Sequence, residues 1–273
     1  QDTSEIIDYI ESLHHDNPVI PNTPVQEFAS MLLEAWGDEW WVPIAMHTRW
    51  NYPENYAVFE HDAGKALLPW MPRFLQNKAA QRPAKMLKGM LPFVGIVPEQ
   101  YDTMNEWTVQ MLDTLDMHFK QFPFLLGARP TLGDFGLVGT MYGHLGRDPW
   151  PKRELIEPRK HLHAWLERMK DPASHAQFDL LPNDEIPATL NPVFRSIFDE
   201  FIPMVASVGD LATEHAAHAP GHQPGQHQTS GKSAQGHQRI WPRQAEQQTH
   251  RINHRHVAHA RHEGVLFSMK ACT

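Results

Sequence analysis

The clearest pattern in the chain is a run of apolar residues at three- and four-residue steps between Glu99 and Phe122. Acidic and polar residues fall largely off this stripe, as in an α-helix that buries one face. The pattern predicts a long helix in the core of a helical bundle. The stripe consists of Tyr101, Met104, Trp107, Met111, Leu115, Phe119 and Phe122.

A second helix, with an explicit start signal, is predicted from Thr131. Thr131 can cap it by accepting a hydrogen bond from the N–H three residues on, while Asp134 accepts one from the N–H of Thr131, as in a capping box. Gly136, Gly139 and Gly143 leave one face without side chains, and each costs a helix about 1 kcal/mol relative to alanine. We therefore expect another helix to approach this face closely. A loop is the alternative, but these residues keep a helical apolar spacing: Leu132, Phe135, Val138, Met141 and Tyr142.

Helical patterns account for most of the remaining sequence up to Val208, so the fold class is predicted to be all-α. Residues 3–13 and 162–169 each carry a helical apolar stripe, and a helix with Thr23 as its cap is expected to begin at Pro24. A further helix over 192–208 is expected to be interrupted at Pro203. Four prolines are expected to cut residues 56–98 into short helices: Pro69, Pro72, Pro83 and Pro92.

Composition narrows the class of protein. The 273 residues carry a net charge of −8, which argues against nucleic acid as a partner, and the single cysteine, Cys272, excludes a disulfide framework. No apolar run reaches the roughly 20 residues that span a bilayer, and nothing resembles a signal peptide. We expect a soluble, cytoplasmic protein with no membrane partner. The basic segment within 56–98 suits an anionic ligand, but a solvated surface is the favoured interpretation.

The sequence changes character near Glu214. Ten of the nineteen histidines lie in residues 214–273, together with many glutamines and few large apolar residues. Such a segment cannot bury enough apolar surface to offset its ordering entropy, so we expect disorder. Helical histidine spacings between His250 and His262 are compatible with a metal ion, but no metal site is predicted. A frameshifted coding end is the sharper hypothesis for this tail.

Two stretches resemble cytosolic glutathione transferases. Residues 124–134, Phe-Leu-Leu-Gly-Ala-Arg-Pro-Thr-Leu-Gly-Asp, are similar to the segment that introduces the central buried helix of that family's all-helical domain. Gly133 takes the place of the family's usual small residue before the aspartate. The run 162–169, which ends at Asp171-Pro172, resembles a later helix of the same domain. The resemblance implies a glutathione-transferase C-terminal-type bundle in which the Thr131 helix is central.

Residues 2–11 resemble the last helix of the family's thioredoxin-like domain. In the family an acidic or amide residue followed by Ser or Thr binds the γ-glutamyl end of glutathione, and Asp2 and Thr3 match that pair. A carboxylate can hold the ligand's ammonium group, and a hydroxyl with helix N-terminal N–H groups can hold its carboxylate. The resemblance therefore implies that Asp2 and Thr3 bind glutathione as co-substrate.

An aromatic cluster follows the first helix of the bundle. Tryptophans at this density usually form core. The resemblance offers an alternative, because the first helices of this domain line the pocket for the electrophilic substrate in glutathione transferases, and aromatic walls suit apolar molecules. The candidate pocket residues are Trp40, Trp41, His47 and Trp50.

The resemblance also implies an organisation and a function. We expect residues 1–16 to be the end of a thioredoxin-like domain, 17–23 a linker, 24–213 the helical domain and 214–273 the tail. Because the chain begins with Gln1, not Met, we expect an amino-terminal truncation that removes the thiol-activating residue and leaves this fragment inactive. The intact parent, an expected homodimer, would transfer glutathione to a small electrophile or use it for reduction or isomerisation. Two alternatives stay open: a non-catalytic protein-interaction scaffold, and an unrelated bundle in which the Thr131 helix is peripheral.

Overall fold

The computed structural model describes residues 3–14, 18–171 and 179–218, with side chains for 6–14, 18–171 and 179–214. The chain divides into two compact units, Gln1–Gln238 and Arg239–Thr273, and all described residues lie in the first. Every regular element among these residues is a helix, and the only β-type pairings are the isolated bridges of Gly127 with Phe124 and with Leu180. The predicted all-α class is confirmed.

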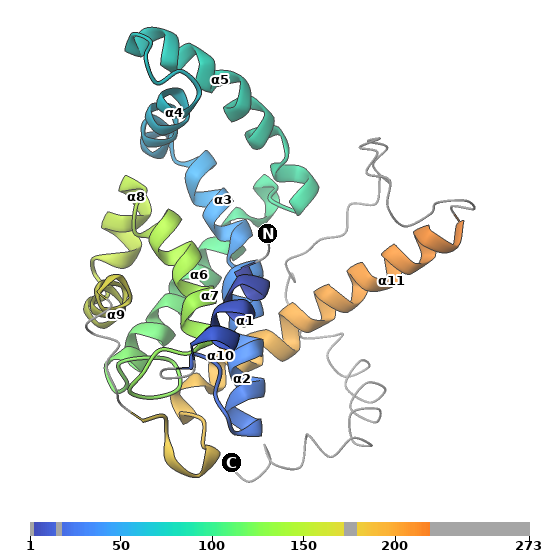
Figure 1. The fold of residues 1–273 in the computed structure, drawn as a ribbon. Coiled ribbons are helices and arrows are strands. Elements are labelled where there is room, and N and C mark those ends of the chain that lie inside the picture. Colours follow the sequence, from blue (N-terminus) through green and yellow to red (C-terminus); the bar gives the residue numbers. More distant parts are fainter. Residues whose placement is uncertain (1–2, 15–17, 172–178, 219–273) are drawn as a thin grey trace. The chain divides into compact units, whose positions relative to one another are not determined.

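The first half of the helical unit is a series of helices and helical turns, five of which begin with a proline in the first turn, where its missing N–H costs nothing. They are shown in blue to teal in Figure 1. The elements are α1 (Thr3–Leu13), α2 (Pro24–Ala35), the π-helical turn η1 (Trp36–Trp40), α3 (Val42–Asn51), α4 (Pro53–Leu67), α5 (Arg73–Gly89) and the short 3₁₀ turns η2 (Leu91–Val94) and η3 (Pro98–Gln100).

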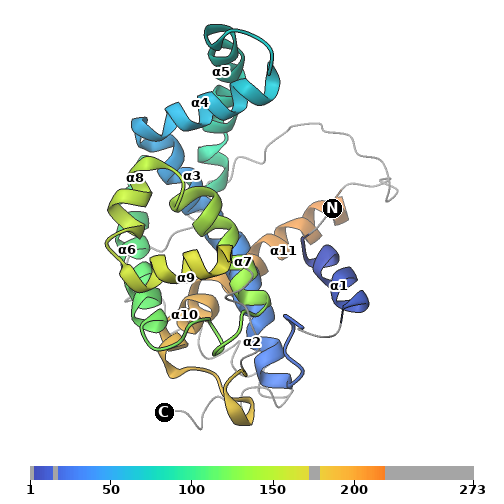
Figure 2. The same cartoon turned by 60° about the vertical axis from the view of Figure 1, so that its left-hand side comes forward.

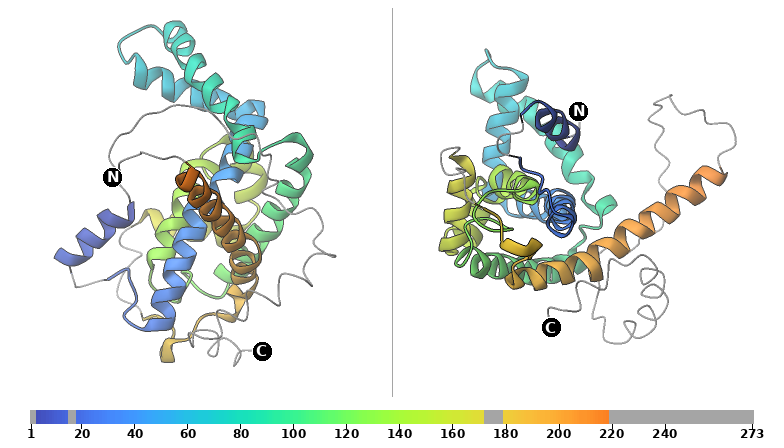
Figure 3. Two further views of the ribbon diagram at one scale, coloured as in Figure 1. Left: turned by 90° about the vertical axis from the view of Figure 1, so that its right-hand side faces the viewer. Right: turned by 60° about the horizontal axis from the view of Figure 1, so that its bottom comes forward.

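The second half supplies the long central helix and the elements around it (Figures 1 and 2). Figure 3 shows α11, the long helix with which this half ends. The elements are α6 (Tyr101–Phe119), α7 (Leu132–Thr140), η4 (Met141–Leu145), α8 (Pro149–Pro151), η5 (Lys152–Ile156), α9 (Lys160–Lys170), η7 (Pro182–Asp184), η8 (Ala188–Leu190), α10 (Asn191–Ser196), η9 (Ile197–Phe201) and α11 (Ile202–His218).

The helix that starts at Thr131 is central. α7 packs against α2, η1 and α9, and it continues directly into the π-helical turn η4. Leu137 in its middle is fully buried. Of the two bundle interpretations, the central position agrees with the glutathione-transferase-type domain and contradicts the unrelated bundle with a peripheral Thr131 helix.

Only the beginning of the glycine face of α7 is closely approached by another helix. A Cβ on Gly136 would lie 2.6 Å from the Glu34 carbonyl oxygen, and one on Gly133 would lie 2.7 Å from the Leu33 Cβ. The approach is reciprocal, since a Cβ on Gly37 would lie 2.6 Å from the Leu137 nitrogen. The predicted close approach is therefore correct for Gly136, and α2 with η1 is the approaching helix.

The later glycines do not take part in this approach. A Cβ on Gly139 would have one neighbour within 4 Å, the Asp38 carboxylate at 3.9 Å, and one on Gly143 would have none. The prediction is wrong for these two positions because α2 and η1 meet α7 over residues 133–137 and leave its later turns uncovered on that side.

Three predicted boundaries also differ. Pro83 lies inside the 17-residue helix α5 and does not break it, because Ala80 and Ala84 are buried and the tertiary packing holds the helix together. α6 ends at Phe119, before Phe122. Pro203 lies in the first turn of α11, and this helix runs on to His218, beyond the domain end expected at residue 213. The rest of the tail, including Cys272 and the histidines from His250 to His262, lies outside the described residues.

Candidate functional site

Asp134 is the polar centre of the helical unit. Its Oδ1 accepts hydrogen bonds from the Leu125 N–H and the Trp165 Nε1–H, both at 3.0 Å. Its Oδ2 accepts from the N–H of Thr131 at 2.9 Å and from the Thr131 hydroxyl at 3.1 Å. Thr131 and Asp134 form the predicted capping box, and both are fully buried. One carboxylate thus ties the start of α7 to the loop before it and to α9.

The electrostatics of Asp134 are a balance of opposed effects. Complete burial raises the pKa of its carboxyl to about 6, whereas the four donated hydrogen bonds favour the ionised form and limit the rise. The indole of Trp165, itself buried, stacks on Phe119 with the ring centroids 4.8 Å apart. The arrangement joins α6, α7 and α9 and has no open face for a ligand, so its role is structural.

The aromatic cluster packs between η1, α6 and η9. Trp41 lies 5.0 Å from Trp107 and 5.6 Å from Trp36, measured between ring centroids, and Trp40 lies 5.9 Å from Phe201. Trp40 is 1% exposed to solvent and Trp41 is completely buried. This burial favours the core interpretation for Trp40 and Trp41, and a substrate-facing role for them stays a prediction.

His47 and Trp50, on α3, are also buried. The His47 Nε2–H donates to the Asn105 Oδ1 at 3.1 Å, and its Nδ1 accepts from the Asn51 amide at 2.8 Å. Burial lowers the pKa of His47, so its imidazole is neutral near pH 7. Trp50 packs edge-on against Phe59, with centroids 4.8 Å apart. Through the side chain of Asn105, which is partly exposed, His47 is connected to the surface.

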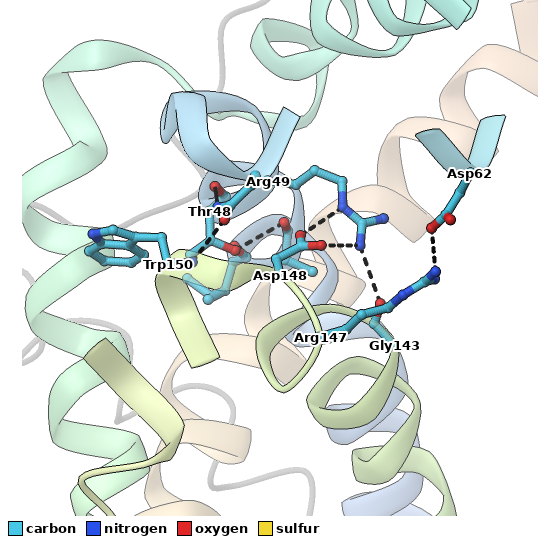
Figure 4. Close-up of polar contacts among 10 residues, drawn as sticks. Thr48, Arg49, Asp62, Gly143, Arg147, Asp148 and Trp150 are labelled. Atoms are coloured by element: carbon cyan, nitrogen blue, oxygen red, sulfur yellow. Dashed lines mark hydrogen bonds and ion pairs between the residues drawn. The ribbon is translucent and has the colours of Figure 1, made fainter. Parts of the chain in front are cut away.

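An ion pair beside this region joins α3 to the turn before α8 (Figure 4). The Arg49 guanidinium donates to both carboxylate oxygens of Asp148, at 2.8 and 2.9 Å, and to the Gly143 carbonyl at 3.2 Å. Asp148 is completely buried. Nearby, Arg147 pairs with Asp62 at the surface. Because the buried pair is bidentate and fully engaged, it is a structural clamp and not a free anion site.

A groove of about 920 Å³ runs along the outer side of α6. Its wall is mostly apolar, and it carries two acidic side chains, Glu106 and Asp113, of which Asp113 is paired with Arg159 at 2.8 Å. Such a surface disfavours an anion and suits an apolar molecule that is uncharged or cationic. The residues of α6 that line it are Asn105, Glu106, Val109, Gln110, Asp113, Thr114 and Met117, and Gln121, Ala188, Thr189 and Pro192 complete it.

Two buried histidines form hydrogen bonds with polar side chains that line this groove. Asn105 accepts from His47, as described, and also from the Tyr52 hydroxyl at 3.3 Å. Thr189 donates its hydroxyl to the Nδ1 of His118 at 2.7 Å, while the His118 Nε2–H donates to the Phe124 carbonyl at 3.2 Å. Burial lowers the pKa of His118 to about 4. Both imidazoles are neutral near pH 7 and fix the orientation of the groove residue that each one contacts.

Comparison with known proteins identifies the domain. Residues 98–168 match the family model of the glutathione S-transferase C-terminal domain, and this segment holds α6, α7, α9 and the Asp134–Trp165 hydrogen bond. The chain carries a glutathione S-transferase C-terminal domain. No curated protein and no solved structure matches the chain. The match supports membership of the glutathione S-transferase superfamily.

The two residues predicted to bind glutathione, Asp2 and Thr3, stand at the amino-terminal end of the sequence. Asp2 lies outside the described residues, and Thr3 is the first residue of α1, with its side chain outside the description. Binding of glutathione by Asp2 and Thr3 stays a prediction. In the described part of the chain, the groove on α6 and a smaller pocket beside Arg49 are lined by residues other than Trp40, Trp41, His47 and Trp50.

Sequence reasoning missed Asn105, Thr189 and Asp148 as elements of this glutathione S-transferase-type domain. Asn105 and Asp148 are isolated polar residues in a helix and a turn, and only the tertiary fold brings them to His47 and Arg49. Within the described residues, no three His, Cys, Asp or Glu side chains gather at a metal-binding distance, and no helix is both long and apolar enough to cross a membrane.

Proposed function

We propose that this protein acts in glutathione chemistry, with a small apolar electrophile as its second substrate. The observation that carries the proposal is the match of residues 98–168 to the glutathione S-transferase C-terminal domain, together with the central position of α7. The groove along α6 supports an electrophile without negative charge, because its wall is apolar, Glu106 is acidic and the charge of Asp113 is balanced by Arg159. The reaction class is addition of the glutathione thiol to the electrophile, or its use in reduction or isomerisation.

Glutathione itself is anionic and does not suit the acidic groove. Its proposed site is the amino-terminal edge, at Asp2 and Thr3, where a carboxylate would take the ammonium group of the ligand and the start of α1 its carboxylate. The two substrates would thus be recognised by surfaces of different charge.

The test is conjugation of a chromogenic aryl halide by the protein as its own gene encodes it. Val109→Asp places a charge on the groove wall at a half-exposed position and is expected to raise KM for the aryl halide at least tenfold, with KM for glutathione unchanged. Val205→Asp on α11, at similar exposure, is the matched control and leaves both constants unchanged. Thr3→Ala is expected to raise KM for glutathione alone. Equal behaviour of Val109→Asp and Val205→Asp would remove the groove from the proposal.

A second candidate function is a protein-interaction scaffold, and one observation favours it. α11 and the turn before it carry an exposed apolar stripe at helical spacing, formed by Phe198, Ile202, Val205, Val208 and Leu211. Retention of the protein on immobilised glutathione supports the enzyme. Loss of a protein partner on Val208→Ser and Leu211→Ser, in a protein that does not bind glutathione, supports the scaffold.

A further inference from the structure

The segment from Ala63 to Pro98 has a charge opposite to that of the whole chain. It contains six lysine and arginine residues and no aspartate or glutamate, although the chain carries a net charge of −8. All six cationic side chains are exposed, and none forms an ion pair with another described residue. They lie on the end of α4 and along α5, at Lys65, Arg73, Lys78, Arg82, Lys85 and Lys88.

Large apolar side chains share this surface at the turn between α4 and α5. Trp70 is 94% exposed and Phe74 70% exposed, and Leu67 and Met71 are also open to solvent. We call these four residues the hairpin tip. A soluble protein rarely exposes such a contiguous apolar patch without a binding role.

The hairpin tip is held in place by its own hydrogen bonds. The Gln76 side-chain amide donates to the carbonyls of Leu68, at 3.1 Å, and Met71, at 2.9 Å. α4 and α5 touch at this end, because a Cβ on Gly64 would lie 2.6 Å from the Gln76 carbonyl oxygen. The hairpin is visible in Figures 1 and 2. Trp70 therefore projects from an ordered turn. The entropy cost of ordering the backbone of this turn is met before any partner binds.

We propose that the hairpin tip docks on an anionic bilayer surface. Trp70, Phe74 and the two aliphatic side chains enter the interfacial region, while the neighbouring cations meet lipid phosphates. Lysine and arginine suit this position because their long stems lie along apolar surface while the charge stays at the headgroups. The sequence led us to expect no membrane partner, because no segment can span a bilayer. Docking from one side requires no spanning segment.

Two other polyanionic partners fit the hairpin less well. Single-stranded nucleic acid is bound by aromatic rings on which bases stack, whereas Leu67 and Met71 offer no ring. A partner protein commonly places its anchors in concave pockets. The pocket on α6 lies elsewhere, and the one beside Arg49 reaches Ala66 on α4 but is lined by none of the four tip residues. An apolar tip with Lys65 and Arg73 beside it and further cations along α5 matches the layered chemistry of a bilayer surface, which is apolar beneath a plane of phosphates.

The test is flotation of the full 273-residue chain with vesicles. Vesicles with about one third phosphatidylserine are expected to carry the protein at low salt, whereas pure phosphatidylcholine vesicles are not. Raising the salt from 0.1 M to 1 M shortens the screening length from about 10 to about 3 Å and is expected to release the protein. Brominated acyl chains are expected to quench part of the tryptophan fluorescence in the wild-type chain, and Trp70→Phe to remove that quenching.

Variants separate the electrostatic contribution of the cations from the contribution of the apolar side chains. Arg73→Glu with Lys78→Glu is expected to weaken partitioning by at least about 25-fold, at about fivefold for each cation. Lys120→Glu with Lys160→Glu makes the same change in net charge at exposed sites outside the hairpin and is expected to change partitioning little. Trp70→Ser with Phe74→Ser is expected to abolish binding, and Val208→Ser with Leu211→Ser on α11 to leave it intact.

Four results overturn the proposal. They are no flotation with anionic vesicles, equal flotation with neutral vesicles, equal loss from the hairpin and control charge variants, and displacement of the chain from vesicles by a single-stranded homopolymer at equal phosphate concentration. Self-association that Trp70→Ser with Phe74→Ser removes, without any vesicle binding, assigns the tip to a second copy of the chain instead.

Discussion

Replacing Asp134 with alanine tests the polar centre of the domain. The substitution removes the acceptor of four buried donors: the N–H groups of Leu125 and Thr131, the indole N–H of Trp165 and the Thr131 hydroxyl, which alone can rotate to another acceptor. A buried donor left without an acceptor costs about 1–3 kcal/mol. Ionisation of the carboxylate in the core is unfavourable, and its removal offsets part of this loss. We expect Asp134→Ala to lower the free energy of unfolding by about 4 kcal/mol.

The assay is urea unfolding at pH 7.5, followed by tryptophan fluorescence and by far-ultraviolet circular dichroism. With a urea dependence of about 2 kcal/mol/M, the midpoint is expected to move down by about 2 M. Asp134→Asn is the matched control, because its amide oxygen still accepts from Leu125 and Trp165 while its NH₂ group faces the Thr131 donor. It is expected to cost about half as much as alanine. A loss below about 1 kcal/mol for Asp134→Ala would refute the reasoning.

Three further predictions concern packing, acid stability and the buried ion pair. Gly136→Ala, whose Cβ would meet the Glu34 carbonyl oxygen at 2.6 Å, is expected to lower the free energy of urea unfolding by about 1–3 kcal/mol. Gly139→Ala is expected to be neutral or mildly stabilising. Equal effects of the two substitutions would contradict the close approach of α2 to α7 at Gly136. The pKa of His118 is lowered from 6.5 to about 4, so its contribution to stability is present above pH 6.5 and is lost as the pH falls. This corresponds to about 2 kcal/mol between pH 7 and 5. Asp134, with its pKa raised to about 6, makes the protein more stable as the pH falls over the same range. The test therefore compares wild type with His118→Asn, which keeps Asp134 and is expected to lose less free energy of unfolding between pH 7 and 5. Identical pH profiles would contradict this role of His118. Arg49→Met leaves the Asp148 carboxylate buried without its partner and is expected to cost about 3–5 kcal/mol, part of which Arg49→Met with Asp148→Asn recovers; additive losses in a double-mutant cycle would contradict the clamp.

The sequence was most informative where local chemistry decides structure. The capping box at Thr131 and Asp134 depends on two residues three apart, and the long helix over 101–119 depends on apolar spacing alone, so both were predictable. The family resemblance rested on the same residues, since Asp134 and Trp165 lie in the matched segment.

Long-range contacts were beyond the sequence pattern. Gly136 and Gly139 look alike in sequence, and only the point at which α2 meets α7 distinguishes them. Pro83 carries a helix-breaking signal that the packing of α5 overrides. The groove beside Asn105 and Thr189 joins residues from distant parts of the chain, so no local motif announces it. The tryptophans at 40 and 41 could not be assigned to core or pocket until their neighbours were known.

The central claim, that the helical domain serves glutathione chemistry, is tested most directly by one kinetic measurement. The rate of conjugation of a chromogenic aryl halide is measured against glutathione concentration, using the protein as its own gene encodes it. The account predicts turnover that saturates with glutathione, with KM for the aryl halide raised at least tenfold by Val109→Asp and not by Val205→Asp. A folded protein that neither binds glutathione nor accelerates its conjugation would contradict the account.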